Sequence, residues 1–155
     1  MENCEPAYDF EKTARFLEDF CISRGGALAA VHKESKKVVG YILFNALEES
    51  VFEMGWLFNR NHWRNGYAFE SCKAVIDYAF VEMNVHKICA ETIDCVKSVS
   101  LMKKLRMRPE GIQRSQTRDN HGNWADLYLY GLLEKHYREE KQHEKNCCTD
   151  MQPIL

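Results

Sequence analysis

The stretch from Phe58 to Cys72, FNRNHWRNGYAFESC, concentrates polar and aromatic side chains directly before a run of helical periodicity. Its one glycine, Gly66, precedes Tyr67, from which apolar residues recur at helical spacing. A strand that ends near Phe58 and a helix that starts near Tyr67 would gather unpaired backbone N–H groups at the positive end of a helix dipole. Such groups bind anions, so the stretch predicts an anion site at the start of the helix.

The small residues of this stretch favour a phosphate-bearing ligand. Gly66 would let an oxygen approach the main chain closely, Ala68 keeps the first helical turn narrow, and Arg64 could add a charge-assisted contact. These features suit a pyrophosphate. One glycine is neither the G-x-G-x-x-G of a dinucleotide fold nor a P-loop, so spacing alone leaves open the alternative of an ordinary strand-to-helix turn.

The overall composition is typical of one globular domain. The chain has 155 residues, 45% of them hydrophobic, which is enough to build a core. The formal net charge is -2, and the scattered lysines and arginines argue against a nucleic-acid partner and against an acidic membrane surface. No apolar run reaches the roughly 18 to 20 residues of a membrane span, and the first residues, MENCEPAYDF, lack the pattern of a signal peptide. We therefore expect a cytoplasmic protein with no membrane partner.

The cysteines predict reduced thiols rather than disulfides or a zinc site. Their number is odd and no Cys-x-x-Cys pair occurs. Cys72 and Cys89 lie in apolar surroundings, where they would serve as small core residues. His143 and Cys147 could ligate a metal, but they lie in a polar segment, and we expect no metal site.

Hydrophobic periodicity divides the chain into alternating helices and strands. We expect helices over about 9–22, 67–83 and 97–107, and strands over about 26–33, 37–47, 50–59, 85–93, 110–119 and 124–133. The helix between the strands at 50–59 and 85–93 favours parallel pairing through a right-handed crossover, whereas the hairpins make the other neighbours antiparallel. The chain should form one α/β (α+β) domain over 1–141, with a mobile tail over 142–155.

Three motifs follow one another along the chain. EMGWLFNRNHWRNGYAFES is similar to an E-I-G-Y-W-(L/V) strand followed by W-G-K-G-Y-A-T-E-A, SVSLMKKLRMRPEG to S-x-R-V-x-E-K-L-G-F-x-x-E-G, and DNHGNWADLYLYGLL to G-x-x-x-D-x-x-x-Y-x-x-L. In this order they resemble the GCN5-related N-acetyltransferases (GNAT), especially the branch that acetylates protein N-termini, including those of ribosomal proteins. The resemblance covers residues 8–138. It implies a mixed, mostly antiparallel sheet of about six strands with helices on both faces, splayed between the strands at 50–59 and 85–93.

The resemblance also implies that the chain binds acetyl-coenzyme A (acetyl-CoA). The backbone of Trp56, Leu57 and Phe58 would pair with the pantetheine arm like an added strand. The amides of the loop would hold the pyrophosphate, from Trp63, Arg64, Asn65, Gly66, Tyr67 and Ala68. Cys95 takes a coenzyme-contacting position at which the family usually has asparagine.

The implied reaction transfers acetyl to a primary amine, on a protein or peptide N-terminus or on a small molecule. Glu53 is the candidate base, and its alternative role is a structural carboxylate. Ser98 matches a serine close to the coenzyme sulfur and is the candidate acid, and its alternative role is to satisfy a backbone N–H at a helix start. Met102 stands where other branches have a proton-donating tyrosine, so that route is closed here.

Several departures from the family pattern leave a second function open, a degenerate module that binds acyl-CoA or a partner protein without turnover. Besides Cys95, they are Arg64–Asn65 for the usual Gly-Lys and Arg106–Met107 for Gly-Phe, so the helix end lacks its favoured left-handed residue. Relative to the family, we also expect a strand and a helix to be missing before residue 8. The edge of the strand at 26–33 would then be exposed, and we expect a homodimer or the C-terminal segment to cover it.

Overall fold

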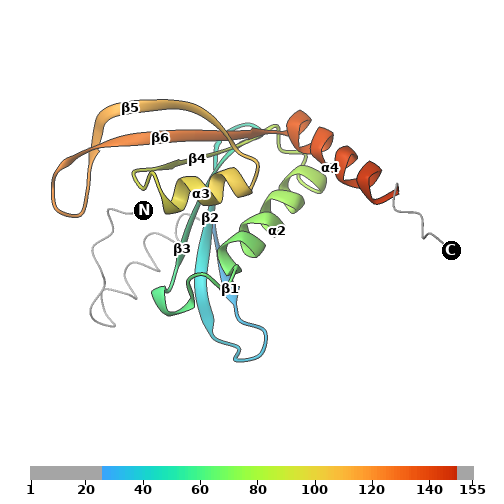
Figure 1. Ribbon diagram of the computed structural model, residues 1–155, viewed down its shortest axis with the longest axis horizontal. Coiled ribbons are helices and arrows are strands. Elements are labelled where there is room, and N and C mark those ends of the chain that lie inside the picture. Colours follow the sequence, from blue (N-terminus) through green and yellow to red (C-terminus); the bar gives the residue numbers. More distant parts are fainter. Residues whose placement is uncertain (1–25, 150–155) are drawn as a thin grey trace.

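One six-stranded sheet organises the computed structural model, which describes residues 26–149 and, in the last helix, side chains as far as residue 143 (Figure 1). The strand order is β1-β2-β3-β4-β6-β5. The strands are β1 (Ala27–Val31), β2 (Val38–Glu48), β3 (Val51–Phe58), β4 (Lys87–Thr92), β5 (Arg108–Arg118) and β6 (Trp124–Leu133). The helices are the 3-10 turn η2 (Arg60–His62), α2 (Tyr67–Val81), α3 (Lys97–Lys104) and α4 (Glu134–Thr149). None of the described helices is long and apolar enough to cross a membrane.

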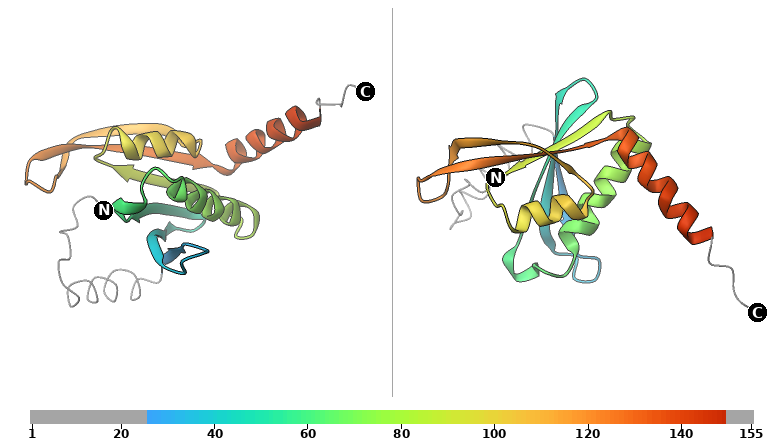
Figure 2. Two further views of the ribbon diagram at one scale, coloured as in Figure 1. Left: turned by 60° about the horizontal axis from the view of Figure 1, so that its bottom comes forward. Right: turned by 45° about the horizontal axis from the view of Figure 1, so that its top comes forward.

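The sheet consists of two antiparallel halves, β1-β2-β3 and β4-β6-β5. Only three parallel residue pairs join them, from Val51↔Lys87 to Glu53↔Cys89. Beyond this seam β3 pairs with β2 alone and β4 pairs with β6 alone, and Figure 2 shows the two halves diverging. The predicted mixed sheet with a splay between the third and fourth strands is thus confirmed.

The core lies between one face of the sheet and the two helices α2 and α3. Strand residues such as Ile42, Met54 and Ile88 point to this face and pack with Cys72 and Met102 of the helices, all 3% exposed or less. Their alternation in the strands and their three- and four-residue spacing in the helices are the patterns that the sequence predicted. The helix predicted over 9–22 lies outside the described residues, within which α2 and α3 cover one face of the sheet.

Cys89 does not belong to this core. It is half-buried on the opposite face of β4, and its thiol donates a hydrogen bond to the carbonyl of Phe52 at 3.3 Å. The parallel pairing of Phe52 with Ile88 sets the phase of β4 and places Ile88, not Cys89, towards α2. The buried position expected for Cys72 is confirmed, whereas the one expected for Cys89 is not.

The C-terminal helix α4 packs against α2 and β6. Tyr137 stacks on Phe80 of α2 with ring centroids 4.9 Å apart, and its hydroxyl donates to Asp77 at 2.8 Å. Strands β2, β3 and β4 separate β6 from β1, and α4 lies far from β1 in Figure 1. The expectation that the C-terminal segment covers the edge of β1 is therefore wrong for α4, which continues to Thr149.

Two arginines adopt the left-handed backbone conformation that glycine accepts most easily. Arg64, before α2, has φ 66°, and Arg106, after α3, has φ 63°. Both stand where the resembling family motif has glycine. Because a Cβ crowds the backbone in this region, each arginine costs about 1 to 2 kcal/mol relative to an unstrained conformation.

Replacing Arg106 by glycine should therefore raise the free energy of unfolding by about 1 kcal/mol, because glycine adopts this conformation without the steric cost. Among the described residues its one ion pair is an exposed contact with Glu140 at 3.7 Å, and losing such a pair costs little. Urea unfolding measures the change. The control is Arg108→Gly, because Arg108 lies in β5 without a positive φ, and there glycine should destabilise by about 0.5 to 1 kcal/mol. If both variants lose stability alike, Arg106 is not strained.

Candidate functional site

The inner edge of β3 borders the gap between the two halves of the sheet. The N–H of Asn59 donates to the carbonyl of Val39 at 2.9 Å, which fixes the phase of the β2–β3 ladder. Since alternate residues of an antiparallel strand turn their backbone groups to opposite sides, Trp56 and Phe58 turn theirs towards the gap, and Leu57 turns its own to β2. Of the three residues expected to pair with pantetheine, two thus offer main-chain groups to the gap.

The loop between β3 and α2 closes one end of the gap. The side chain of Asn59 accepts a hydrogen bond from the N–H of Asn61 at 2.9 Å, which opens the turn η2. The side-chain amide of Asn65 donates to the carbonyl of His62 at 3.2 Å. The indole N–H of Trp63 donates to the carbonyl of Phe58 at 2.7 Å and ties the loop back to the end of β3. The loop is thus braced by its own side chains.

The start of α2 carries no side-chain cap. Its N-cap residue is Gly66, with φ 83°, and the first helical bond is from the N–H of Glu70 to the carbonyl of Gly66 at 3.0 Å. Within the described chain, the N–H groups of Tyr67, Ala68 and Phe69 therefore have no helical partner. A Cβ built on Gly66 would meet no atom within 4 Å, so open space lies next to these donors.

The start of α3 lies across the mouth of the gap from this loop. The ammonium group of Lys97 lies 4.8 Å from the centre of the Trp63 ring, a cation–π contact that links α3 to the loop. Arg64, the residue that follows Trp63, is exposed. Positive side chains therefore accompany the uncapped start of α2.

Asp94, which the sequence analysis missed, caps α3. One of its carboxylate oxygens accepts hydrogen bonds from the N–H groups of Val96 and Lys97 at 2.9 and 2.8 Å. Ser98 is half-buried in the first turn of α3, and Cys95 is an exposed free thiol in the turn before it. The signal for this cap was an aspartate three residues before the helix, in the strand-to-helix turn IDCVK.

Glu53 stands at the point where β3 and β4 separate. It belongs to the last residue pair of the seam, and its partner Cys89 is followed on the same face of β4 by Glu91. Burial raises the pKa of the Glu53 carboxyl, and the negative charge of Glu91 raises it further. This face is opposite to the one that α2 and α3 cover.

The structure thus places the predicted site residues in four groups, of which the first is the end of β3, with Trp56, Leu57 and Phe58. The residues of the phosphate loop, from Trp63 to Ala68, lie together between β3 and α2. Glu53 lies at the base of the gap, while Ser98 and Cys95 lie on the β4 side, at the start of α3. In the described part of the chain, no three potential metal ligands come together.

Known proteins are similar to this chain in sequence and in fold. Residues 1–108 match the family of the acetyltransferase (GNAT) domain, so the chain belongs to the GNAT family. The uncharacterised N-acetyltransferase YnaD of Bacillus subtilis (strain 168) is 36% identical over 102 residues, which are 64% of this chain and 59% of YnaD. The chain thus spans about three fifths of the length of that relative.

Two solved structures show the same fold. A GNAT-family acetyltransferase from Bacillus anthracis is 28% identical with a TM-score of 0.72, covering 83% of this chain and 76% of that protein. The ribosomal-protein-S5-alanine acetyltransferase from Vibrio fischeri is 18% identical with a TM-score of 0.67, covering 86% and 79%. The second likeness is one of fold alone.

Replacing Asp94 by alanine should lower the free energy of unfolding by about 1 kcal/mol, because two N–H groups at the start of α3 lose their acceptor. Asp94→Asn should keep most of the stability, because asparagine caps a helix about as well as aspartate. Chemical unfolding of the three proteins tests the assignment. Equal stability of wild type and Asp94→Ala would mean that another group caps α3.

Proposed function

We propose that this protein is a cytoplasmic N-acetyltransferase that moves an acetyl group from acetyl-CoA to a primary amine, at a protein or peptide N-terminus or on a small molecule. The observation that carries the proposal is the uncapped start of α2 beside the divergent edge of β3. Family membership supports the reaction class.

The described residues suit acetyl-CoA as the acetyl donor. Of the loop amides expected to hold its pyrophosphate, that of Trp63 already donates to the carbonyl of Arg60 at 3.2 Å. The amides from Arg64 to Ala68 would therefore hold the pyrophosphate, with open space beside Gly66 for the phosphate oxygens. The inner edge of β3 turns the N–H and carbonyl of Trp56 and the N–H of Phe58 to the gap, where they could pair with the amides of the pantetheine arm, as an added strand would. The carbonyl of Phe58 already accepts the indole N–H of Trp63. Arg64 and Lys97 contribute positive charge next to the same loop.

Once bound, acetyl-CoA supplies a thioester carbonyl that a neutral amine attacks and a thiolate that leaves. A main-chain N–H of β3 at the gap would stabilise the negative charge that develops on the carbonyl oxygen. Glu53 would accept the proton of the amine. The pKa of Glu53 is raised towards neutral pH, and a general base is most effective when its pKa lies near the working pH. Ser98 is the proposed proton donor to the thiolate.

The ease with which an amine loses its proton supports an N-terminal α-amine as the acceptor. An α-amine, with a pKa of about 8, is neutral far more often at neutral pH than a lysine amine of about 10.4. A single carboxylate such as Glu53 is then a sufficient base for a peptide N-terminus. The structurally similar protein from Vibrio fischeri is named as a ribosomal-protein-S5-alanine acetyltransferase, which is in keeping with this class.

A second candidate function is binding of acyl-CoA or of a partner protein without turnover. It is favoured by Cys95, which replaces the coenzyme-contacting asparagine of the family pattern. The two functions separate in one assay, the release of free thiol from acetyl-CoA with a panel of peptides, polyamines and aminoglycosides. Binding without thiol release for the whole panel would favour the second function.

Saturating acetyl-CoA should stabilise the protein against heat, by about 2.7 kcal/mol at a concentration one hundred times the Kd. Gly66→Val should abolish this shift, because valine fills the space beside the amides and opposes the positive φ. Gly122→Val is a matched control, since Gly122 also has positive φ and open space around its Cβ position but lies in the β5–β6 turn. It should lose similar stability and keep the ligand shift. If Gly66→Val keeps the shift, the loop does not bind the coenzyme.

With an acceptor from the panel, Glu53→Gln should lower kcat/KM by roughly a hundredfold or more, as expected for a lost general base. Glu91→Gln removes a charge that raises the pKa of Glu53, so the acidic limb of the pH–rate profile should move to lower pH. Rates measured from about pH 5 to 9 test both effects. A Glu91→Gln profile that coincides with that of the wild type would remove Glu53 from the role of base.

A further inference from the structure

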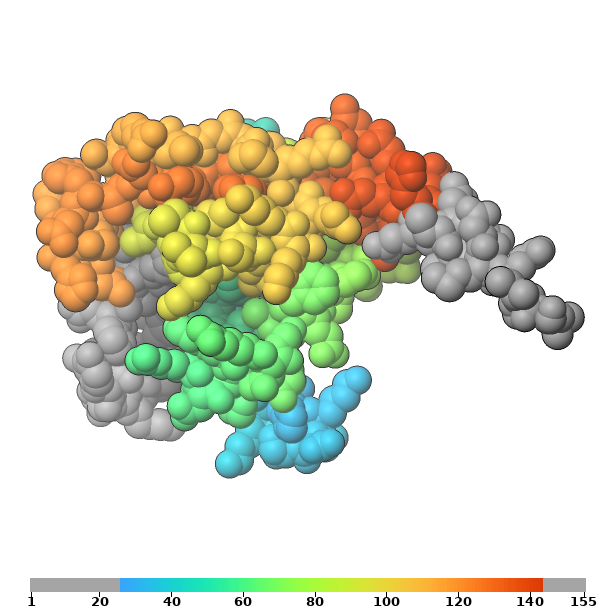
Figure 3. Space-filling model, in the orientation of Figure 1, coloured from blue at the N-terminus to red at the C-terminus, as the bar shows by residue number. Residues whose placement is uncertain are grey.

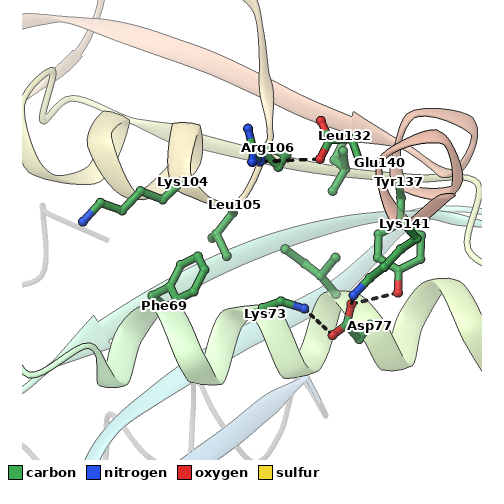
Figure 4. Close-up of a pocket in the computed structure, with 11 residues that line it drawn as sticks. Phe69, Lys73, Asp77, Lys104, Leu105, Arg106, Leu132, Tyr137, Glu140 and Lys141 are labelled. Atoms are coloured by element: carbon green, nitrogen blue, oxygen red, sulfur yellow. Dashed lines mark hydrogen bonds and ion pairs between the residues drawn. The ribbon is translucent and has the colours of Figure 1, made fainter. Parts of the chain in front are cut away.

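A pocket separate from the inner edge of β3 lies where α2, the end of α3 and the start of α4 meet (Figure 4). Figure 3 shows the surfaces of these three helices side by side. Its lining includes four cationic side chains, Lys73, Lys104, Arg106 and Lys141, and two carboxylates, Asp77 and Glu140. The lining thus has an excess of two positive charges. This cluster was not foreseen from the sequence, in which the basic residues are scattered over three helices.

One end of the pocket is neutralised internally. Lys73 and Lys141 approach the carboxylate of Asp77 to 2.7 and 3.5 Å, and the Tyr137 hydroxyl donates to it at 2.8 Å, as Figure 4 shows. Partial burial opposes ionisation of Asp77, but the hydrogen bonds from Lys73 and Tyr137 and the two positive charges lower its pKa. Asp77 is therefore ionised at neutral pH and balances one of the two lysines.

The other cations are poorly matched by carboxylates. The guanidinium of Arg106 lies 3.7 Å from Glu140, longer than a charge-assisted hydrogen bond, and its side chain is 68% exposed. Lys104 extends from α3 at the end of the pocket opposite to Asp77 (Figure 4). Among the described residues no ion pair involves Lys104.

Arg106 is held at the pocket in an unfavourable backbone conformation. It follows α3 with φ 63°, where glycine would fit without strain and where the family motif has glycine. The weak contact with Glu140 does not offset this cost. An arginine kept in such a conformation indicates a role for its side chain.

We propose that this pocket binds a phosphate monoester carried on an aromatic body. A monoester bears about two negative charges at neutral pH, which matches the excess on the lining, and the planar guanidinium of Arg106 can bind two of its oxygens. Lys104 adds a second cation. The body of the ligand contacts the apolar part of the lining, which includes Leu105 and the ring of Phe69, 37% exposed.

Titration with adenosine 5′-monophosphate (AMP) by calorimetry tests the proposal. We expect AMP to bind and adenosine, which lacks the phosphate, to bind at least about tenfold more weakly, as the loss of charge-assisted hydrogen bonds implies. Arg106→Gly and Lys104→Gln should each weaken AMP binding by roughly tenfold. Lys103→Gln, at a neighbouring lysine of α3 that does not line the pocket, is the control and should bind AMP like the wild type.

The variants also separate this site from the acetyl-CoA loop. Gly66→Val should keep AMP binding, and Arg106→Gly remains informative because it is expected to be at least as stable as the wild type. A monoester can be a separate small molecule or the 3′-phosphoadenosine end of coenzyme A. We expect undiminished AMP binding at saturating acetyl-CoA, as for a separate ligand, whereas displacement by acetyl-CoA but not by its 3′-dephospho form would assign the pocket to the coenzyme and overturn the proposal.

Three further results would overturn the proposal. The first is that AMP does not bind at about 10 mM, a concentration far above the Kd of a typical small-molecule site. The second is equal affinity for AMP and adenosine, and the third is AMP binding that is lost in Gly66→Val but kept in Arg106→Gly. None of them bears on acetyl-CoA binding by the loop, which the Gly66 and Gly122 variants test independently.

Discussion

The brevity of the pairing between β3 and β4 is the constraint on which the rest of the structure depends. Three residue pairs hold the strands together, and each strand then follows its other neighbour. The backbone groups that β3 turns to the gap lose their strand partner, and buried backbone groups need partners. Under the proposed function, an extended ligand with amide groups, such as a pantetheine arm, would supply these partners, and the divergence that interrupts the sheet would provide its binding edge.

The two helices that start near the gap differ in whether a side chain caps their first N–H groups. Asp94 accepts the first N–H groups of α3, and its negative charge compensates the helix dipole. At the start of α2 the N-cap is Gly66, which has no side chain to offer. The uncompensated donors are thus at the start of α2, and under the proposed function this is where an anionic group would be held.

Local patterns predicted the elements well, and long-range contacts were predicted poorly. The spacing of Cys72 and Ile76 located the buried face of α2, and the hairpin residues located β5 and β6, because these features depend on period and turn chemistry alone. The divergence of β3 from β4 came from the family resemblance, since no residue pattern specifies where a parallel pairing stops.

The errors have the same physical origin. Cys89 was expected in the core, but a strand has two faces, and the pairing of Phe52 with Ile88 decides which one turns to α2. The segment after Leu133 was expected, as the alternative to a homodimer, to cover the edge of β1, but its Tyr137 packs on Phe80 and bonds to Asp77 of α2. The cap on Asp94 had a local signal that was overlooked, whereas the gathering of cations around Arg106 had none.

The narrow seam between the halves of the sheet has a mechanical consequence. Three residue pairs at one end of β3 and β4 form a narrow hinge, and the far ends of the two strands lie beyond it without pairing to each other. A small rotation at Glu53 becomes a larger displacement at Phe58 and Thr92. A ligand that bonded to both strands near these far ends would brace the sheet where its own hydrogen bonds are absent, so the rigidity of the domain would depend partly on ligand binding.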